Sequence, residues 1–218
     1  MKKIAFFAVF AFFVCGADVF AQGADDKINE ILLKMEAADK TINSLEVDYT
    51  QDIFYSATGE TQNIKGNLKY KRPSSIFILQ KTPQEQKIYI DGKKITIYTP
   101  DNAQAITDKW NNLVNGDFAP ASMINFGSNW QSIKKDNVIR YVGEDDDNYA
   151  IEIYPAKKKD WTMRMDVSKK TMRPQRAVVT APGLSIKVQL TNYKVNPEFK
   201  KDIFKFVPPE GTEVIKLN

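Results

Sequence analysis

Apolar and polar residues follow two different periods along the chain, and the change between them separates a helical part from an extended part. From Ala24 to about Ser44, apolar residues recur every three or four positions, which predicts an amphipathic helix. Asp25 or Asp26 is available as its N-cap. The apolar positions of this helix are Ile28, Ile31, Leu32, Met35 and Ile42.

The period changes to two after this helix, as expected of β-strands that have one apolar face. Asp91 and Gly92 separate two such runs and predict a hairpin. Pairing across either a two- or a four-residue loop places the isoleucines of both runs on one face. The alternating apolar positions in this part of the chain are Leu45, Val47, Tyr49, Leu68, Tyr70, Ile76, Ile78, Ile88, Ile90, Ile95 and Ile97.

Three later segments repeat the alternation, namely "YAIEIYP" from Tyr149, "WTMRMDV" from Trp161 and "LSIKVQL" from Leu184. Many antiparallel strands with one apolar face indicate a strongly curved sheet or barrel, because such a sheet hides its apolar side by curling around it. The fold class that we expect is therefore mainly β with some α.

The strand rhythm is interrupted at residues 110–130. Asn-Gly and Ala-Pro pairs there predict loops that flank a short helix. Together with the N-terminal helix, this piece could cover the open side of a half-barrel. Its apolar residues are Phe118, Met123, Ile124 and Phe126.

The first residues, "MKKIAFFAVFAFFVCGADVFAQ", predict a secretory signal peptide that is cut after Ala21. The apolar run Ile4–Val14 is too short to span a bilayer, which takes about 20 residues. Cys15 raises the alternative of a lipid-anchored protein, but Val14 stands where a bacterial lipobox has a small residue. We therefore expect residues 1–21 to be removed and residues 22–218 to form a single exported domain.

The composition excludes several kinds of chemistry. The chain has no histidine, and its one cysteine belongs to the signal peptide, so the mature domain has no His-based catalysis, no His-ligated zinc and no disulfide. Nucleotide-binding and serine-hydrolase motifs are missing. A formal net charge of +4 is far from the signature of a nucleic-acid-binding protein. We expect no enzymatic activity, no cofactor, no metal and no nucleic acid partner.

Two charge runs have ordinary structural explanations. Residues 144–147, "EDDD", lack the alternating ligands and the glycine of an EF-hand loop, which favours a solvated hairpin turn over a calcium site. The three lysines at residues 157–159 indicate a solvated turn, or else a surface that attracts an anionic partner.

An arginine ends the apolar row of the segment "GNLKYKRP". With a period of two, Leu68, Tyr70 and Arg72 share one face. Pro73 favours a strand end or bulge there, which could turn Arg72 outward. In the alternative, the guanidinium points inward at the rim of the apolar face and must be hydrogen-bonded, with backbone carbonyls as natural acceptors.

Four segments together resemble the LolA family, the periplasmic carriers of outer-membrane lipoproteins. They are "INSLEVDYTQ" from Ile42, "GNLKYKRP" from Gly66, "YIDGKKITIYTPDNAQA" from Tyr89 and "FKFVPPEGTEV" from Phe204. They occur in the order and at the spacing of the family and span nearly the whole mature chain, whereas residues 110–200 match less clearly.

The resemblance implies an open, strongly curved antiparallel β-barrel in which helices form a lid over an apolar cavity. Its partners would be triacylated lipoproteins, an inner-membrane lipoprotein-releasing ABC transporter and an outer-membrane acceptor, and the carrier would act as a monomer in the periplasm. Arg72 falls on the arginine with which the family holds its lid. The alternating apolar residues given above would line the acyl-chain cavity, and the lid would carry Ile28, Ile31, Leu32, Met35, Phe118, Met123, Ile124 and Phe126.

Other functions are compatible with the same fold. One is a lipid-binding sensor or regulator, which would detect acylated protein and signal through a partner. Another is a lipid-anchored outer-membrane receptor, and a third is a small-molecule enzyme that uses a similar half-barrel. The export signal and the lack of a convergent polar cluster argue against the enzyme.

Overall fold

The computed structural model describes residues 17–109, 130–158 and 160–217. In these residues, strands greatly outnumber helices. The elements, in chain order, are α1 (Ala17–Lys40), β1 (Ser44–Tyr55), β2 (Glu60–Lys71), β3 (Ser75–Thr82), β4 (Gln86–Ile90), β5 (Lys94–Thr99), η1 (Pro100–Asn102), β6 (Gln104–Lys109), α4 (Trp130–Asp136), β7 (Asn137–Glu144), β8 (Asn148–Pro155), β9 (Thr162–Ser168), β10 (Pro174–Ala181), β11 (Leu184–Val195), η2 (Lys201–Phe204) and β12 (Glu213–Lys216).

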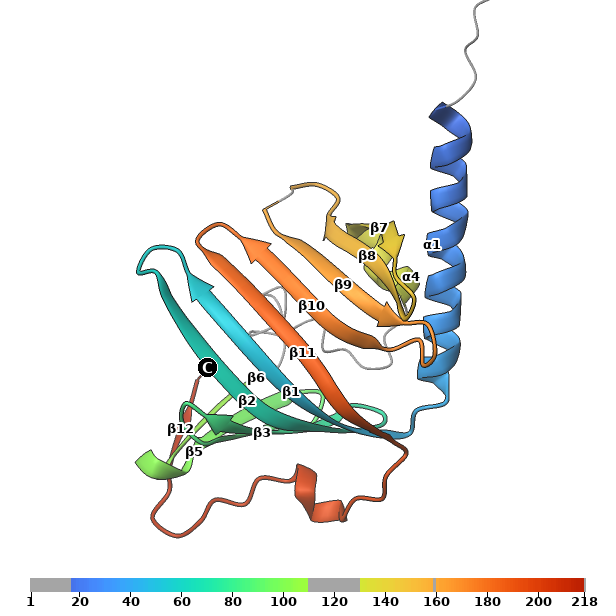
Figure 1. The fold of residues 1–218 in the computed structure, drawn as a ribbon. Helices are drawn as coiled ribbons and strands as arrows, with labels where there is room; N and C mark the ends of the chain where they lie inside the picture. Colours follow the sequence, from blue (N-terminus) through green and yellow to red (C-terminus); the bar gives the residue numbers. More distant parts are fainter. Residues whose placement is uncertain (1–16, 110–129, 159, 218) are drawn as a thin grey trace, which may run out of the picture.

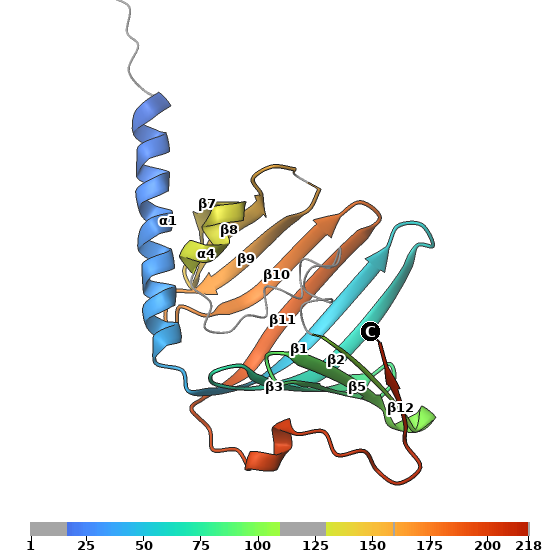
Figure 2. The ribbon, with the colours of Figure 1, turned by 180° about the vertical axis from the view of Figure 1, so that it is seen from behind.

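The described strands form one sheet in the order β12-β6-β5-β4-β3-β2-β1-β11-β10-β9-β8-β7. Neighbouring strands are antiparallel, except that β12 runs parallel to β6. The sheet is open and strongly curved, and α1 stands along its β7 side (Figures 1 and 2). The predicted fold class, a curved antiparallel half-barrel with some helix, is confirmed.

Helix α1 differs from the predicted helix at both ends. It begins at Ala17, so Asp25 and Asp26 lie inside the helix, and the prediction that one of them is its N-cap is wrong. It ends at Lys40, where the backbone N–H of Thr41 bonds to the Ala38 carbonyl. A turn of residues 41–43 leads from the helix into β1, which begins at Ser44, so Ile42 lies after the helix and not within it as predicted. Within the described residues, no helix has the length and apolarity needed to cross a membrane.

The strands predicted from alternation are confirmed. In the β4–β5 hairpin, Ile90 pairs with Ile95 and Ile88 with Ile97, so all four isoleucines share one face. The three later segments form β8, β9 and β11. The helix predicted within residues 110–130 lies almost wholly outside the described residues, and so do Phe118, Met123, Ile124 and Phe126.

Register connects the apolar residues into rows across one face of the sheet, which we call the inner face. One row crosses six strands from β1 to β7. Another crosses five strands from β1 to β5. The first row is Ile53, Ile186, Val179, Met163, Ile153 and Ile139, and the second is Leu45, Tyr70, Ile76, Ile90 and Ile95. Because Leu45 and Ile53 have the same parity on β1, both rows lie on the same face.

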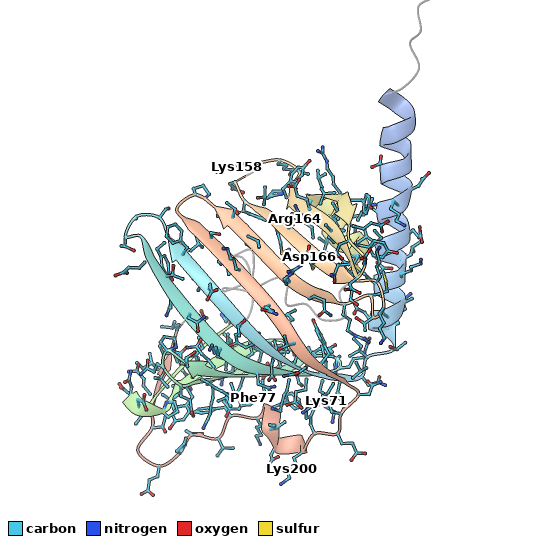
Figure 3. All side chains as sticks on the ribbon, in the orientation of Figure 1. Lys71, Phe77, Lys158, Arg164, Asp166 and Lys200 are labelled. Carbon is cyan, nitrogen blue, oxygen red and sulfur yellow. The ribbon has the colours of Figure 1, made fainter. Side chains whose placement is uncertain are left out.

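The opposite, outer face of β3 to β5 is covered by the segment that follows β11. The ring of Phe206 packs against Tyr89 and Tyr98, with centroid distances of 5.4 and 5.5 Å. Phe77 packs against Tyr89 at 5.1 Å and lies over this segment in Figure 3. A shallow cavity of about 560 Å³ separates η2 from β3 and β4. The C-terminal segment then reaches the far edge of the sheet and adds β12.

Gly66 lies directly beside the ring of Tyr49, a residue of the neighbouring strand β1. The two residues are cross-strand partners. A Cβ at Gly66 would lie 2.5 Å from the carbonyl oxygen of Leu79 and 2.6 Å from the Tyr49 ring. The absence of a side chain therefore lets this ring lie flat on the inner face.

We expect Gly66→Ala to lower the free energy of unfolding by about 1–3 kcal/mol, because both the ring and the β3 backbone must move. Denaturant titration measures this change. Lys65→Ala, one residue away on the outer face, is the control and should change stability by less than about 0.5 kcal/mol. Equal midpoints for Gly66→Ala and the unsubstituted protein would contradict the packing described for Tyr49.

Candidate functional site

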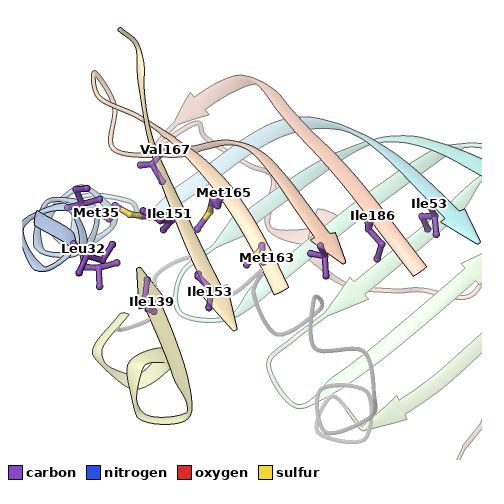
Figure 4. Close-up of a cluster of buried hydrophobic side chains, with 13 residues drawn as sticks. Leu32, Met35, Ile53, Ile139, Ile151, Ile153, Met163, Met165, Val167 and Ile186 are labelled. Atoms are coloured by element: carbon purple, nitrogen blue, oxygen red, sulfur yellow. The ribbon is translucent and has the colours of Figure 1, made fainter. Parts of the chain in front are cut away.

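Helix α1 covers one end of the inner face with a single apolar stripe. Its buried residues follow the i, i+3, i+4, i+7 spacing that places side chains on one face of a helix. They form a cluster with the inner-face residues of β7 to β11 (Figure 4). Their exposed fractions do not exceed 2%: Ile28, Ile31, Leu32 and Met35. The four predicted lid residues within the described part of the chain thus pack directly on the sheet.

The other end of the inner face carries a second apolar cluster. It contains ten of the eleven residues predicted from alternation. Seven are buried, namely Leu45, Val47, Leu68, Tyr70, Ile76, Ile90 and Ile95. Three are partly buried, namely Ile78, Ile88 and Ile97.

Tyr49, the eleventh of these residues, lies on the same face but belongs to neither cluster. Burial raises the pKa of its hydroxyl to about 12, so the side chain stays neutral at physiological pH. Its ring occupies the space left by Gly66, beside the row that contains Val47 and Leu68. The two clusters and Tyr49 together make the inner face a continuous surface without charge along β1.

Arg72 lies just after the end of β2 and binds the C-terminal end of α1. Its Nε donates to the carbonyl oxygen of Ile42 at 2.8 Å, and its Nη2 donates to that of Asp39 at 2.9 Å. Its backbone N–H donates to the carbonyl oxygen of Asn43 at 2.9 Å. As a residue Arg72 is exposed, but its guanidinium reaches along the rim to the helix. We call these two guanidinium bonds the latch.

Asn196, which follows β11, binds the same turn from the other side. Its side-chain oxygen accepts from the backbone N–H of Asn43 at 2.7 Å, and its Nδ2 donates to the carbonyl oxygen of Thr41 at 3.0 Å. The carbonyl of Thr41 and the N–H of Asn43 lie in the turn between α1 and β1, so the side chain of Asn196 pairs backbone groups that would otherwise need water. Asn196 could not be predicted from the sequence, because a lone asparagine after a strand has no distinguishing pattern.

Asp39, in the last turn of α1, is a second residue of this region that the sequence did not predict. Burial raises the pKa of its carboxyl above the ordinary value, and the nearby Trp130 and Arg173 offset only part of this rise. The indole N–H of Trp130 and the Nε–H of Arg173 are buried, yet neither has a hydrogen-bond partner in the described residues. Only the folded chain brings these groups together, so periodicity gave no signal for them.

The two charge runs lie away from the inner face. Residues 145–147 form the turn between β7 and β8, where the carboxylate of Asp145 accepts from the backbone N–H groups of Asp147 and Asn148. Lys157 and Lys158 are exposed in the loop between β8 and β9. The described part of the chain contains no group of three His, Cys, Asp or Glu residues arranged to hold a metal ion.

A comparison with protein families identifies the class to which this fold and its apolar inner face belong. Residues 40–207 match the family "Outer membrane lipoprotein carrier protein LolA". The chain belongs to the LolA family.

Two relatives match over most of their length. An outer-membrane lipoprotein carrier protein of Francisella tularensis subsp. novicida is 24% identical over 216 residues, which are 99% of this chain and 97% of the relative. The protein of the same name from Bordetella avium is 26% identical over 199 residues, which are 90% of this chain and 89% of the relative.

Solved structures share the fold at low sequence identity. An uncharacterized conserved protein from Thermus thermophilus is 11% identical with a TM-score of 0.59, and the match covers 88% of this chain and 99% of that one. MucB is 14% identical with a TM-score of 0.52, and the match covers 87% of this chain and 66% of MucB. Identities this low indicate a common fold and nothing about ligands.

Proposed function

We propose that the protein is a periplasmic carrier that binds the acyl chains of lipoproteins on its inner face. The main support for this proposal is that a helix covers an uncharged apolar face of the sheet. The latch holds this helix at the rim of that face. The family to which the chain belongs and the names of its full-length relatives support the same cargo.

The apolar inner face suits acyl chains because transfer through water is very unfavourable for them. At about 0.8 kcal/mol per methylene, a chain of roughly 14 methylenes is worth about 11 kcal/mol, and a lipoprotein carries up to three such chains. A carrier that captured all of this free energy could not release its cargo, because noncovalent affinities do not exceed roughly −20 kcal/mol.

The latch offers a way to lower the net affinity. Since Leu32 and Met35 pack directly on the inner face, acyl chains reach that end of it only when α1 moves away. The Arg72 bonds exist in the closed position and are given up in the open one, so closure competes with cargo. Arg72 is, in this proposal, the residue that favours hand-over.

The proposed carrier has one membrane partner at each end of its route. The carrier takes triacylated lipoproteins from a releasing ABC transporter in the inner membrane and delivers them to an outer-membrane acceptor. It does so as a monomer, without catalysis and without a cofactor. The predicted signal peptide, residues 1–21, supports the periplasmic location.

A release experiment tests this function. The purified mature protein is added to spheroplasts that synthesise radiolabelled lipoproteins, and the supernatant is analysed for labelled, acylated protein. We expect the lipoprotein to appear in the supernatant in complex with the carrier, and to stay with the spheroplasts when an unrelated periplasmic protein replaces it. Lipoprotein that stays membrane-bound in both cases would refute the proposal.

A further inference from the structure

A row of uncharged polar side chains crosses the inner face from β1 to β6. Cross-strand pairs connect neighbouring strands of this row. Between β4 and β5, the Nε2 of Gln86 donates to the hydroxyl oxygen of Thr99 at 3.4 Å. All of these side chains are partly buried. We call this row the polar belt, and its members are Tyr49, Gln80, Gln86, Thr99 and Gln104.

The polar belt lies directly beside an apolar row of the same face. The two rows are about 7 Å apart, because two residues separate them along each strand. Gln80 and Gln86 are the last cross-strand pair of β3 and β4, so the belt marks where the apolar surface of these strands ends. The neighbouring apolar row contains Leu68, Ile78, Ile88 and Ile97.

The hydroxyl of Tyr49 begins this belt. It lies over Gly66, whose cross-strand partner on β3 is Gln80. Within the described residues this hydroxyl makes no hydrogen bond, and burial alone raises its pKa. A buried hydroxyl without a partner is unfavourable unless a ligand or water supplies one. The space at Gly66 thus holds a hydrogen-bond donor at the end of the apolar surface.

The glutamine amides of the belt have donors and acceptors that the protein does not use. The Nε2 of Gln80 donates to the carbonyl oxygen of Gln84 at 3.1 Å, and that of Gln104 donates to the Glu213 carboxylate at 3.2 Å. Each amide of the belt therefore uses one of its two N–H groups, and within the described residues no donor bonds to its side-chain oxygen. Neutral amides can pair with both carbonyl and N–H groups of a ligand without bringing a charge to the apolar face.

We propose that the polar belt binds the ester and amide groups that join the acyl chains to a lipoprotein. The inference rests on the proposed function, because it places the polar head of the same cargo beside the face assigned to its chains. The hydroxyl of Tyr49 donates to a carbonyl oxygen of this head, and the glutamine amides pair with its other carbonyl and N–H groups. The head thereby keeps its hydrogen bonds when the acyl chains leave water.

The belt gives the inner face a specificity that apolar residues cannot supply. An apolar surface binds any hydrocarbon chain of suitable length. A site that hydrogen-bonds a carbonyl group discriminates against an analogue without that group, because its donors are then left unpaired. The protein therefore prefers acyl chains to alkyl chains of equal length.

Two lipids that differ in a single carbonyl group test this preference. A monoacylglycerol has an ester carbonyl that its alkyl ether analogue lacks, and displacement of an apolar fluorescent dye from the purified mature protein measures the affinity for each. We expect the unsubstituted protein to bind the ester roughly three- to tenfold more tightly than the ether. Tyr49→Phe, which removes only the hydroxyl group, and Gln86→Leu should each reduce this preference without lowering the affinity for the ether.

The matched controls remove the same groups from the outer face. Tyr89→Phe removes a hydroxyl from β4, and Gln189→Leu removes an amide from an exposed position on β11. Both variants should keep the preference for the ester. Circular dichroism shows whether each variant is folded, and since Tyr49 and Gln86 lie on different strands, either variant alone is sufficient for the test.

Equal affinities of the unsubstituted protein for the ester and the ether would overturn the inference and leave the proposed function standing. A preference for the ester that persists undiminished in Tyr49→Phe and Gln86→Leu would overturn it as well. Binding of neither lipid would instead refute the proposed function, and with it this inference.

Discussion

Arg72→Leu is expected to fold and to bind an apolar fluorescent dye, yet to fail in passing lipoprotein to an acceptor membrane. The substitution removes two hydrogen bonds to the end of α1, at 2.8 and 2.9 Å, and so lowers the stability of the closed position by about 1–3 kcal/mol. A shift of this size changes the ratio of closed to open forms about 5- to 150-fold. Because closure no longer competes with cargo, the acyl chains stay bound.

Transfer from the loaded carrier to outer-membrane vesicles measures this effect, with circular dichroism as the test of folding. Lys71→Leu is the matched control, since it removes a positive charge from the neighbouring exposed residue and leaves the latch intact. Transfer by Arg72→Leu at the rate of the control would show that the bonds to Ile42 and Asp39 have no part in hand-over.

Ile88→Asp is expected to lower the affinity for a fluorescent fatty acid by roughly tenfold or more, because it places a charge on the apolar inner face. Ile88 is partly buried in the second cluster, so the protein has room to fold around the substitution. Fluorescence titration gives the dissociation constant directly.

The control for this experiment is the adjacent residue on the other face. Lys87→Asp introduces the same side chain on the outer face, beside the cavity between β4 and η2. Its affinity for the fatty acid should equal that of the unsubstituted protein. If both variants lost affinity equally, the ligand would not be bound on the inner face.

The inner face could be predicted from the sequence because its signal is local. A period of two fixes which residues share a side, and the cross-strand pairs of Ile88 with Ile97 and Ile90 with Ile95 agree with it. The apolar stripe of α1 was equally clear, since its spacing repeats over two turns. Neither signal depends on knowing what lies across the sheet.

The features that were missed depend on contacts between distant segments. The parallel pairing of β12 with β6 joins residues more than 100 positions apart, and nothing in either segment indicates a parallel partner. The environment of Asp39 arises from four separate segments. The wrong N-cap at Asp25 or Asp26 has another cause, because a capping residue is only a local preference and a longer helix overrides it.

For Arg72, a local pattern predicted the position of the residue, but its hydrogen-bond partners depend on a distant segment. Its parity with Leu68 and Tyr70 located it at the rim of the apolar face, but β2 ends at Lys71, so parity no longer determines the direction of the next side chain. The acceptors that hold the guanidinium belong to the end of α1 and the turn after it, about 30 residues earlier in the chain. The family resemblance supplied that partner, and the backbone pattern alone did not.

Native mass spectrometry of the protein isolated from its own periplasm is the most direct test of the carrier function. Ions are selected, the bound molecule is released in the gas phase, and its lipid and peptide parts are identified. We expect a complex of one carrier with one acylated protein, and we expect this complex to be lost in Ile88→Asp. A bound sugar or nucleotide, or a chain that never carries an acylated protein, would contradict it.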